Sequence, residues 1–276
     1  ERSKAFAVFG AVSAGGAAVG LLLGGILTEL LNWRWCLLVN TPVAIIAAFA
    51  TYRVVTESKV TKTGSLDIPG ALLGTLGLVS LVYGFTKAGE TSWDNSTTII
   101  FLVAAVVLLA AFIAVEAKSR NPLLPLRILR DRNRGGSYMT SILLGAAIFG
   151  ASLFLTYYFQ SVLGYTPIQA GLASLPISLG VFTAAGVLGK VLPKIGPRPV
   201  MITGSLFGAA GMALLAQIEV DSNFWALVFP GELLFGLGMG MIFVPLANIA
   251  LINIKPDDAG VASAVLNASQ QVGGSL

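Results

Sequence analysis

Histidine is absent from this 276-residue chain, cysteine occurs once, at Cys36, and charged residues make up only 11% of it. The single cysteine excludes an internal disulfide and a cysteine-based metal site. Without histidine, the usual side chain for proton transfer near neutral pH is missing. A soluble domain carries about a quarter charged residues, so the low charge argues against a soluble fold. We expect neither a metal nor a cofactor.

Long hydrophobic runs dominate the rest of the sequence, which is 55% hydrophobic and contains 32 glycines. About 20 apolar residues in a helix cross the ~30 Å hydrocarbon core of a bilayer. Eight runs approach that length, at residues 5–28, 35–52, 68–86, 97–115, 138–159, 171–188, 200–218 and 224–249. A ninth begins near Ala259 and reaches the end of the chain. Because the runs are continuous and not alternating, they favour helices over a β-barrel. The sequence predicts an all-α membrane protein with about eight full transmembrane helices and a truncated ninth.

The basic residues lie almost entirely on one side of this predicted topology. If residues 1–4 are cytoplasmic, 15 of the 17 lysines and arginines fall in cytoplasmic segments, and only Arg34 and Lys87 lie on the other side. Cytoplasmic loops of membrane proteins carry such an excess. The spread over many short loops leaves no single basic face, which excludes a nucleic-acid partner. We therefore predict a multi-pass protein of the cell's plasma (inner) membrane with residues 1–4 in the cytoplasm.

Glu232 is the only acid that lies well inside a predicted span. It follows the start of its span by about seven residues, which places it ~10 Å below the outer edge by helical rise. A charge at the centre of a membrane helix costs about 3 kcal/mol, so the low dielectric favours the neutral carboxyl. Glu232 is thus a candidate carrier of a proton or a binding group for a cation. The alternative is an acid that faces water at the outer mouth without a function.

Glycines recur every four residues in the first span, at Gly16, Gly20 and Gly24, with Gly25 beside the last. This spacing places them on one helix face, where a second helix can approach closely. Their role in generic helix packing is the plain interpretation. Later, the segment 189–199 joins two spans on the basic side and contains Gly189, Lys194, Gly196 and Arg198. Its glycines and prolines predict a tight turn, although an ordinary basic loop would look the same.

Several amide side chains lie in the spans or at their ends. Asn267 and Gln271 are four residues apart on one helix face, and Gln270 adjoins them. Asn40 lies near the start of the second span. Buried amides often join helices by hydrogen bonds. As a group, the three in the last segment are better candidates for lining a substrate cavity.

These motifs resemble the major facilitator superfamily, and within it the 14-span drug:proton antiporters. The run from Gly16 to Gly25 is similar to the antiporter motif of the family's fifth helix, with Leu21 where that motif has proline. Trp33-Arg34-Trp35 followed by Asn40-Thr41-Pro42 is similar to the start of the sixth helix. The segment 189–198 resembles the cytoplasmic loop motif of the C-terminal half, with Pro193 in place of an aspartate.

The resemblance extends over essentially the whole chain and implies a fragment that covers about helices 5 to 13. Residues 1–53 would then be the last two helices of the N-terminal six-helix half. Residues 54–136 would be the two extra linking helices with basic cytoplasmic loops, and residues 137–276 the first four and a half helices of the C-terminal half. The missing initial Met and the uncharged run at Leu276 agree with a fragment.

By the same resemblance, the protein exports drugs or other amphipathic, often cationic, compounds in exchange for protons. The implied partners are a small-molecule substrate, protons and the lipid bilayer. A facilitator of another solute, such as a lipid precursor, siderophore or amino acid, is the alternative transporter. A non-transporting membrane protein and a membrane-embedded enzyme are further alternatives, although an enzyme would need polar groups clustered at one depth, and the sequence offers one isolated acid.

Overall fold

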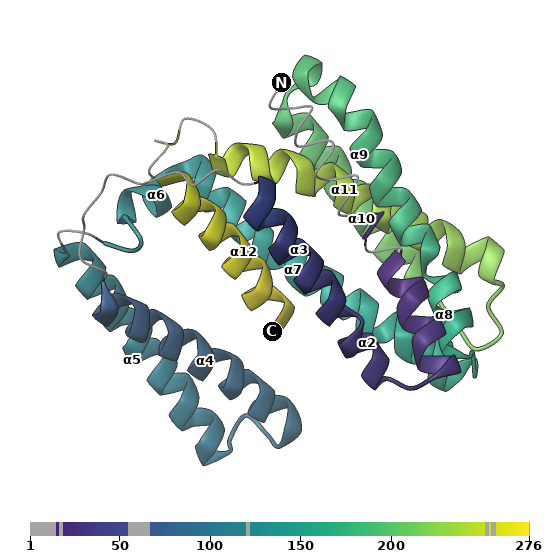
Figure 1. The fold of residues 1–276 in the computed structure, drawn as a ribbon, viewed down its shortest axis with the longest axis horizontal. Helices are drawn as coiled ribbons and strands as arrows, with labels where there is room; N and C mark the ends of the chain where they lie inside the picture. The colour runs from purple at the N-terminus through teal and green to yellow at the C-terminus, as the bar shows by residue number, and fades with distance from the viewer. Residues whose placement is uncertain are drawn as a thin grey trace. The chain divides into compact units, whose positions relative to one another are not determined.

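The structure is a computed structural model that describes residues 15–16, 19–54, 67–119, 122–251, 254 and 258–275. Regular structure in these residues is helical, and they contain no strand, which confirms the predicted all-α class (Figure 1). The helices, with two π-helical turns named η, are α2 (Arg34–Leu38), α3 (Asn40–Val54), α4 (Ile68–Glu90), α5 (Ser96–Lys118), α6 (Leu126–Arg130), α7 (Arg132–Tyr157), η1 (Tyr158–Val162), α8 (Pro167–Ala173), α9 (Leu175–Ile195), α10 (Pro197–Leu215), η2 (Phe224–Val228), α11 (Phe229–Leu251) and α12 (Ala259–Ser275).

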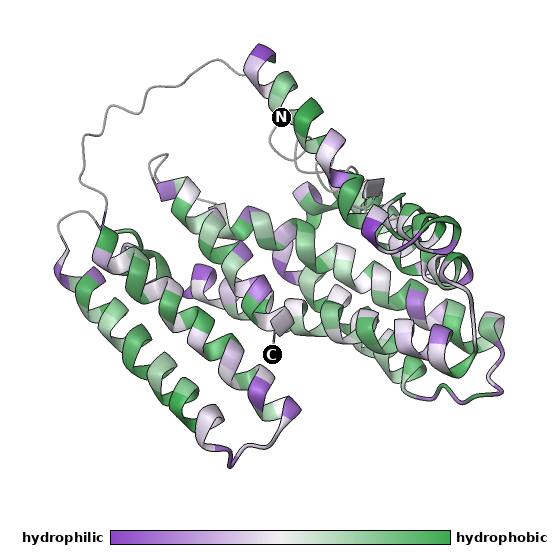
Figure 2. Cartoon of the chain, turned by 60° about the horizontal axis from the view of Figure 1, so that its bottom comes forward, coloured by the Kyte–Doolittle hydropathy of each residue, from purple (hydrophilic) through white to green (hydrophobic). Residues whose placement is uncertain are grey.

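The predicted spans agree with these helices. Seven segments of the described residues are helical, long and apolar enough to cross a membrane, and α2 with α3 forms one of them, Arg34–Val54. The shorter apolar helix Val19–Leu30 is the described part of the first predicted span, and α12 corresponds to the ninth. Figure 2 shows hydrophobic residues along the helices and hydrophilic ones gathered toward many of their ends. The start of the first span and residues 1–4 lie outside the described residues.

Two tight turns divide the chain, and the second lies where the sequence predicts one. Before α8, Gly164 adopts a φ of 67°, and Thr166 caps the helix by accepting a hydrogen bond from the backbone N–H of Gln169. The Gln169 side chain in turn accepts from the Thr166 backbone N–H, which completes a capping box. Between α9 and α10 the connection is the single residue Gly196, with a φ of 83°. Both positive φ values favour glycine.

The described helices belong to two compact units, and the division into residues 1–53, 54–136 and 137–276 stays a prediction. One unit comprises Glu1–Val60 and Ser152–Pro245, and the other comprises Thr61–Ala151 and Leu246–Leu276. In the second unit, α4 and α5 form a hairpin (Figure 1). Leu102 and Leu109 of α5 pack against α4 where Gly84 and Gly77 leave room for them.

In the first unit, α11 contacts both α9 and α10 through glycines. Gly236 and Gly240, four residues apart on one face, lie against the backbone of α9. Gly231 and Gly238 lie against α10, where a Cβ on Gly231 would come 2.9 Å from the Leu215 side chain. Membrane helices approach closely where their residues are small. These contacts hold α11 against two neighbours at once, and α11 carries Glu232.

Candidate functional site

Glu232 lies in the first turn of α11, and its side chain is fully buried, with 0% exposure. Neither carboxyl oxygen has a hydrogen-bond partner. The alternative in which Glu232 faces water at an outer mouth does not fit this conformation. An ionised carboxylate buried without a hydrogen bond or a cation is strongly unfavourable. The conformation in the structure therefore suits the neutral, protonated form of Glu232.

The helical register explains why Glu232 is buried. It precedes Gly236 by four residues, so it shares the face of α11 that contacts α9. A Cβ on Gly236 would collide with the backbone of Ile177, which shows how closely the two helices approach there. Pro230 and Gly231, which precede Glu232, lie in the same first turn of the helix. A charged side chain at such a contact has no room to reach water along its own helix.

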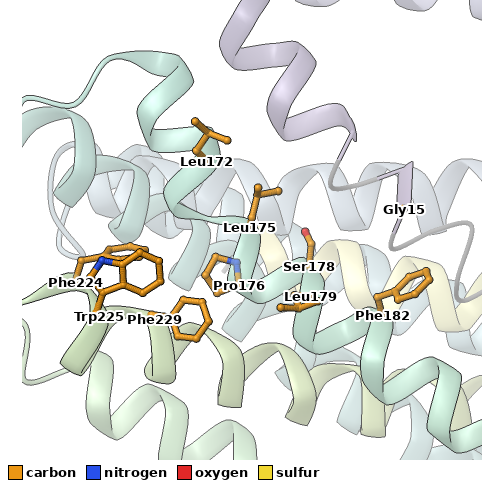
Figure 3. A pocket seen from close by; sticks show the side chains of 10 residues that line it. All are labelled: Gly15, Leu172, Leu175, Pro176, Ser178, Leu179, Phe182, Phe224, Trp225 and Phe229. Atoms are coloured by element: carbon orange, nitrogen blue, oxygen red, sulfur yellow. The ribbon is translucent and has the colours of Figure 1, made fainter.

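An apolar pocket of about 440 Å³ lies at the start of α11 and α9 (Figure 3). Figure 3 shows three aromatic side chains, Phe224, Trp225 and Phe229, grouped on the η2–α11 side of this pocket. The ring centroids of Trp225 and Phe229 are 5.4 Å apart. Most of the other lining residues come from α8 and α9, and the complete lining is Gly15, Leu172, Leu175, Pro176, Ser178, Leu179, Phe182, Phe224, Trp225 and Phe229.

The pocket and the buried acid occupy consecutive turns of one helix. Phe229 lines the pocket, and Glu232 follows it by three residues, about one helical turn deeper. On α9, Pro176 and Ser178 line the pocket and flank Ile177, the residue in contact with Gly236. The pocket can hold an aliphatic or aromatic group, and Glu232 is not one of its lining residues. Glu232 was predicted from the sequence, but this pocket was not.

The sequence did not show which aromatic and aliphatic residues line the pocket, because residues of these types occur throughout the membrane spans. Trp225 carries the interface signal of tryptophan and is 73% exposed, as an interface anchor would be. The π-helical turn η2, which places Phe224 and Trp225, leaves no mark in the hydropathy pattern. Such turns occur often at functional sites.

The glycine motif of the first span contacts α8 at one of its four predicted positions. A Cβ on Gly25 would come 2.7 Å from the Pro167 carbonyl oxygen and 3.1 Å from Ile168 Cα. Across the same contact, a Cβ on Gly171 would come 3.0 Å from the Leu21 carbonyl oxygen. At Gly16, Gly20 and Gly24 a Cβ would come within 4 Å of no atom of the residues that the structure describes. Glu29 adds a hydrogen bond to this contact by accepting from the Ile168 N–H at 3.1 Å.

Replacing Gly25 by leucine in the full-length protein should therefore disrupt this helix contact, whereas Gly20→Leu should be mild. The new leucine side chain at position 25 would meet backbone atoms, which cannot rotate away. Overpacking of this kind costs about 1–3 kcal/mol. We expect a lower melting temperature and reduced transport for Gly25→Leu at matched expression. An equal effect of both substitutions would mean that the whole glycine face, and not Gly25, makes the contact.

The cytoplasmic loop motif folds as the end of one helix and the start of the next. Gly189 and Lys194 lie in α9, Gly196 forms the turn, and Arg198 lies in the first turn of α10. Lys194 and Arg198 are exposed, and neither makes an ion pair with a described residue. The turn predicted for this segment is confirmed, and its function stays a prediction.

The amide candidates are not gathered around Glu232 within its unit. Asn40 donates a hydrogen bond from its side-chain nitrogen to the Cys36 carbonyl at 2.9 Å, inside its own span. Asn267, Gln270 and Gln271 lie on α12, which belongs to the other compact unit. Asn267 and Gln271 are exposed, and the backbone of Gln270 packs against Gly145 of α7. Their predicted role in lining a cavity is not tested by these contacts.

Seven apolar helices of membrane-spanning length and a buried acid beside an apolar pocket define a polytopic α-helical membrane protein. The family model of the Major Facilitator Superfamily matches residues 1–276. The chain belongs to the Major Facilitator Superfamily, as the resemblance of its motifs predicts.

Relatives in this superfamily are named for antibiotic resistance and export. A puromycin resistance protein of Streptomyces alboniger is 44% identical over 279 residues, which cover 100% of this chain and 55% of that protein. A lincomycin resistance protein of Streptomyces lincolnensis is 34% identical, with 95% of this chain and 54% of that protein covered. A cephamycin export protein of Amycolatopsis lactamdurans is also 34% identical, with 100% and 58% covered. The chain thus spans about half the length of these relatives.

Proposed function

We propose that this chain is the middle and C-terminal part of a 14-span, proton-coupled exporter of the cell membrane. The observation that carries the proposal is the fully buried carboxyl of Glu232, without a hydrogen-bond partner, about one helical turn from Phe229 in the lining of an apolar pocket. In this proposal, Glu232 is the group that exchanges a proton for the substrate. An acid inside a membrane helix is a functional candidate by default, because its burial is costly and needs a compensating role.

The substrate class follows from the two parts of the site. The pocket lining is apolar except for the Ser178 hydroxyl, so it favours an aliphatic or aromatic body. The carboxyl of Glu232, when ionised, favours a cationic group. A compound with both features is amphipathic and cationic. The names of the relatives, which refer to puromycin, lincomycin and cephamycin, support small antibiotic-like molecules as the class.

Exchange of a proton for a cationic substrate needs only one carboxyl that binds the two ligands alternately. A proton neutralises Glu232 and makes the closed, buried conformation favourable. When the site opens to water, the carboxyl loses the proton and can attract a cationic substrate. The helices then alternate between the two sides by rocking of the two halves, as expected for transporters with repeated halves. Because both ligands favour the same group, binding of one displaces the other.

The test is whether substrate moves protons. The full-length protein would be placed in vesicles with a pH gradient and an internal pH-sensitive dye, and a cationic amphipathic compound would be added. We expect the compound to dissipate the gradient faster than in vesicles without protein, and a neutral polar solute of similar size to have no effect. If the compound crosses the membrane through the protein without any proton movement, the transporter is a facilitator. If nothing crosses, the chain belongs to a non-transporting member of the superfamily.

A further inference from the structure

A second pocket, of about 250 Å³, lies where the helix Val19–Leu30 contacts α8. Its lining comes from that helix, from α7 with η1 and from α8 with the residue that follows it, all within the first compact unit. Gly25 and Gly171 line it at the positions where the backbones of the two helices touch. A much larger part of this lining is polar than in the pocket beside α11. The polar side chains belong to Thr28, Thr156, Gln160 and Ser174.

Two of the three hydroxyl groups in this lining donate their protons to backbone carbonyls. Thr156 donates to the Ser152 carbonyl at 2.7 Å. Ser174 donates to the Ala170 carbonyl at 3.0 Å. A hydroxyl has one proton and two lone pairs, so these two oxygens can only accept a further hydrogen bond.

The third hydroxyl, that of Thr28, is in the same condition. Its oxygen lies 3.2 Å from the sulfur of Cys36. The thiol has one proton and donates it to the Gly24 carbonyl at 3.5 Å, so Thr28 is the donor to the sulfur. All three hydroxyl oxygens of the lining therefore offer lone pairs and no proton to a ligand.

The side-chain amide of Gln160 completes the polar lining. It belongs to the π-helical turn η1, and it forms no hydrogen bond with the residues that the structure describes. An amide can donate and accept at the same time. Turns of this kind occur often at functional sites. The pocket thus offers three acceptors and one group that can act in both ways.

We propose that this pocket binds a neutral, hydroxyl-bearing ring of a small molecule, such as a sugar. A ring with several O–H groups supplies the donors that the three hydroxyl oxygens can accept. An apolar group would leave these polar atoms unpaired, which is unfavourable in an enclosed place. The pocket is smaller than the one beside α11, which suits a single ring.

The absence of a charged group in the lining favours a neutral ligand over a cation. Among the described residues, no charged side chain lines this pocket. Glu29, the acid at the same helix contact, is outside the lining and accepts a hydrogen bond from the Ile168 N–H. A cation that left water for this pocket would lack a compensating charge.

This binding site does not depend on the proposed export function. The two pockets share no lining residue, although neighbouring residues line them: Gly171 and Ser174 line one, and Leu172 and Leu175 line the other. Glu232 lines neither pocket. Binding of a sugar can therefore be measured at equilibrium, without transport and without a pH gradient, and either proposal can fail alone.

Binding would be measured by titration of the full-length protein in lipid nanodiscs, followed by saturation-transfer NMR of the ligand. The probes are the methyl glycosides of glucose, galactose and ribose. Each is compared with its fully O-methylated form, which keeps the ring and has no O–H donor. We expect at least one glycoside to bind, and its methylated form to bind at least about fivefold more weakly.

Two outcomes of the titration would overturn the proposal. Binding by none of the glycosides would mean that the pocket takes no sugar, or that another part of the full-length protein fills it. Equal binding of a glycoside and its methylated form would mean that the hydroxyl oxygens recognise no donor. Glucosamine, which carries an ammonium group, tests the charge: binding of glucosamine tighter than that of the neutral glycosides would make this a cation site.

The Thr156→Val substitution removes one acceptor and keeps the shape of the side chain. We expect it to weaken glycoside binding by about fivefold. Thr183→Val in α9 is the matched control, because Thr183 also donates to the carbonyl four residues earlier at 2.7 Å and lines neither pocket. The same affinity in both variants would exclude Thr156 from the site.

A second pair of variants locates the ligand. Gly24 lines the pocket and Gly20 does not, and a Cβ at either position would come within 4 Å of no atom of the described residues. Leucine at position 24 should fill the pocket, so we expect Gly24→Leu to abolish glycoside binding and Gly20→Leu to preserve it. Glycoside binding by Gly24→Leu at the parent affinity would show that the sugar binds elsewhere.

Discussion

Export driven by a pH gradient should fall about tenfold or more when Glu232 is replaced by glutamine in the full-length protein. The amide keeps the size of the side chain and is neutral, so the buried conformation of α11 should remain stable. It cannot release a proton, and it does not attract a cation as a carboxylate does. The variant should therefore express normally, because the structure buries Glu232 without any polar partner that the amide would lose.

The measurement is uptake into energised inverted vesicles over a range of pH, with a cationic amphipathic substrate. Glu232→Asp should retain part of the activity, because it changes only the reach of the carboxyl. Asp94→Asn serves as the control, since Asp94 is an exposed acid in the turn between α4 and α5. Transport by Glu232→Gln at the parent rate with the parent pH profile would show that the carboxyl takes no part in coupling.

Gly236→Ala should destabilise the protein more than alanine at any other glycine of α11. The new Cβ would collide with the Ile177 carbonyl oxygen of α9. Helix α11 also packs against α10 and cannot simply move away from α9. Relief requires that α9 and α11 separate, and overpacking of a tight core costs about 1–3 kcal/mol. Because alanine favours helix more than glycine does, a loss of stability would come from the contact and not from helix propensity.

Thermal unfolding of the purified protein in detergent measures this effect. The matched control is Gly186→Ala in α9, where a Cβ would meet nothing within 4 Å, so its melting temperature should stay equal to the parent or rise. We expect Gly236→Ala to lower the melting temperature by several degrees, as about 1 kcal/mol does in proteins of this size. If Gly236→Ala and Gly186→Ala melt alike, the α9–α11 contact is looser than the structure has it.

Hydropathy predicted the spans because the number of consecutive apolar residues in a membrane helix is set by the thickness of the bilayer. The predicted run 68–86 became α4, and 97–115 became α5, each extended by a few residues. The turn before α8 was also predictable, since Gly164 and Pro167 restrict the backbone locally. What could be predicted was thus the part of the fold that depends on neighbours in sequence.

Contacts between distant residues were not predictable in the same way. Gly236 and Gly240, which follow Glu232, are contact points with α9. Their spacing of four residues was the sign in the sequence that they share one helix face. The packing of Leu102 and Leu109 against Gly84 and Gly77 gave no such sign, because only the folded hairpin brings these residues together. Glu232 was recognised because it stands alone in an apolar run.

The single-residue turn at Gly196 also bears on how the protein is made. Helices α9 and α10 are joined by one residue, and α11 follows and packs against both. Contacts between elements that are close in sequence form early, because little chain entropy is lost in closing the loop. Glycine contacts add no loss of side-chain rotamer entropy. The three helices can therefore associate in the order of their synthesis as they leave the ribosome, before the segment that follows α11 has entered the membrane.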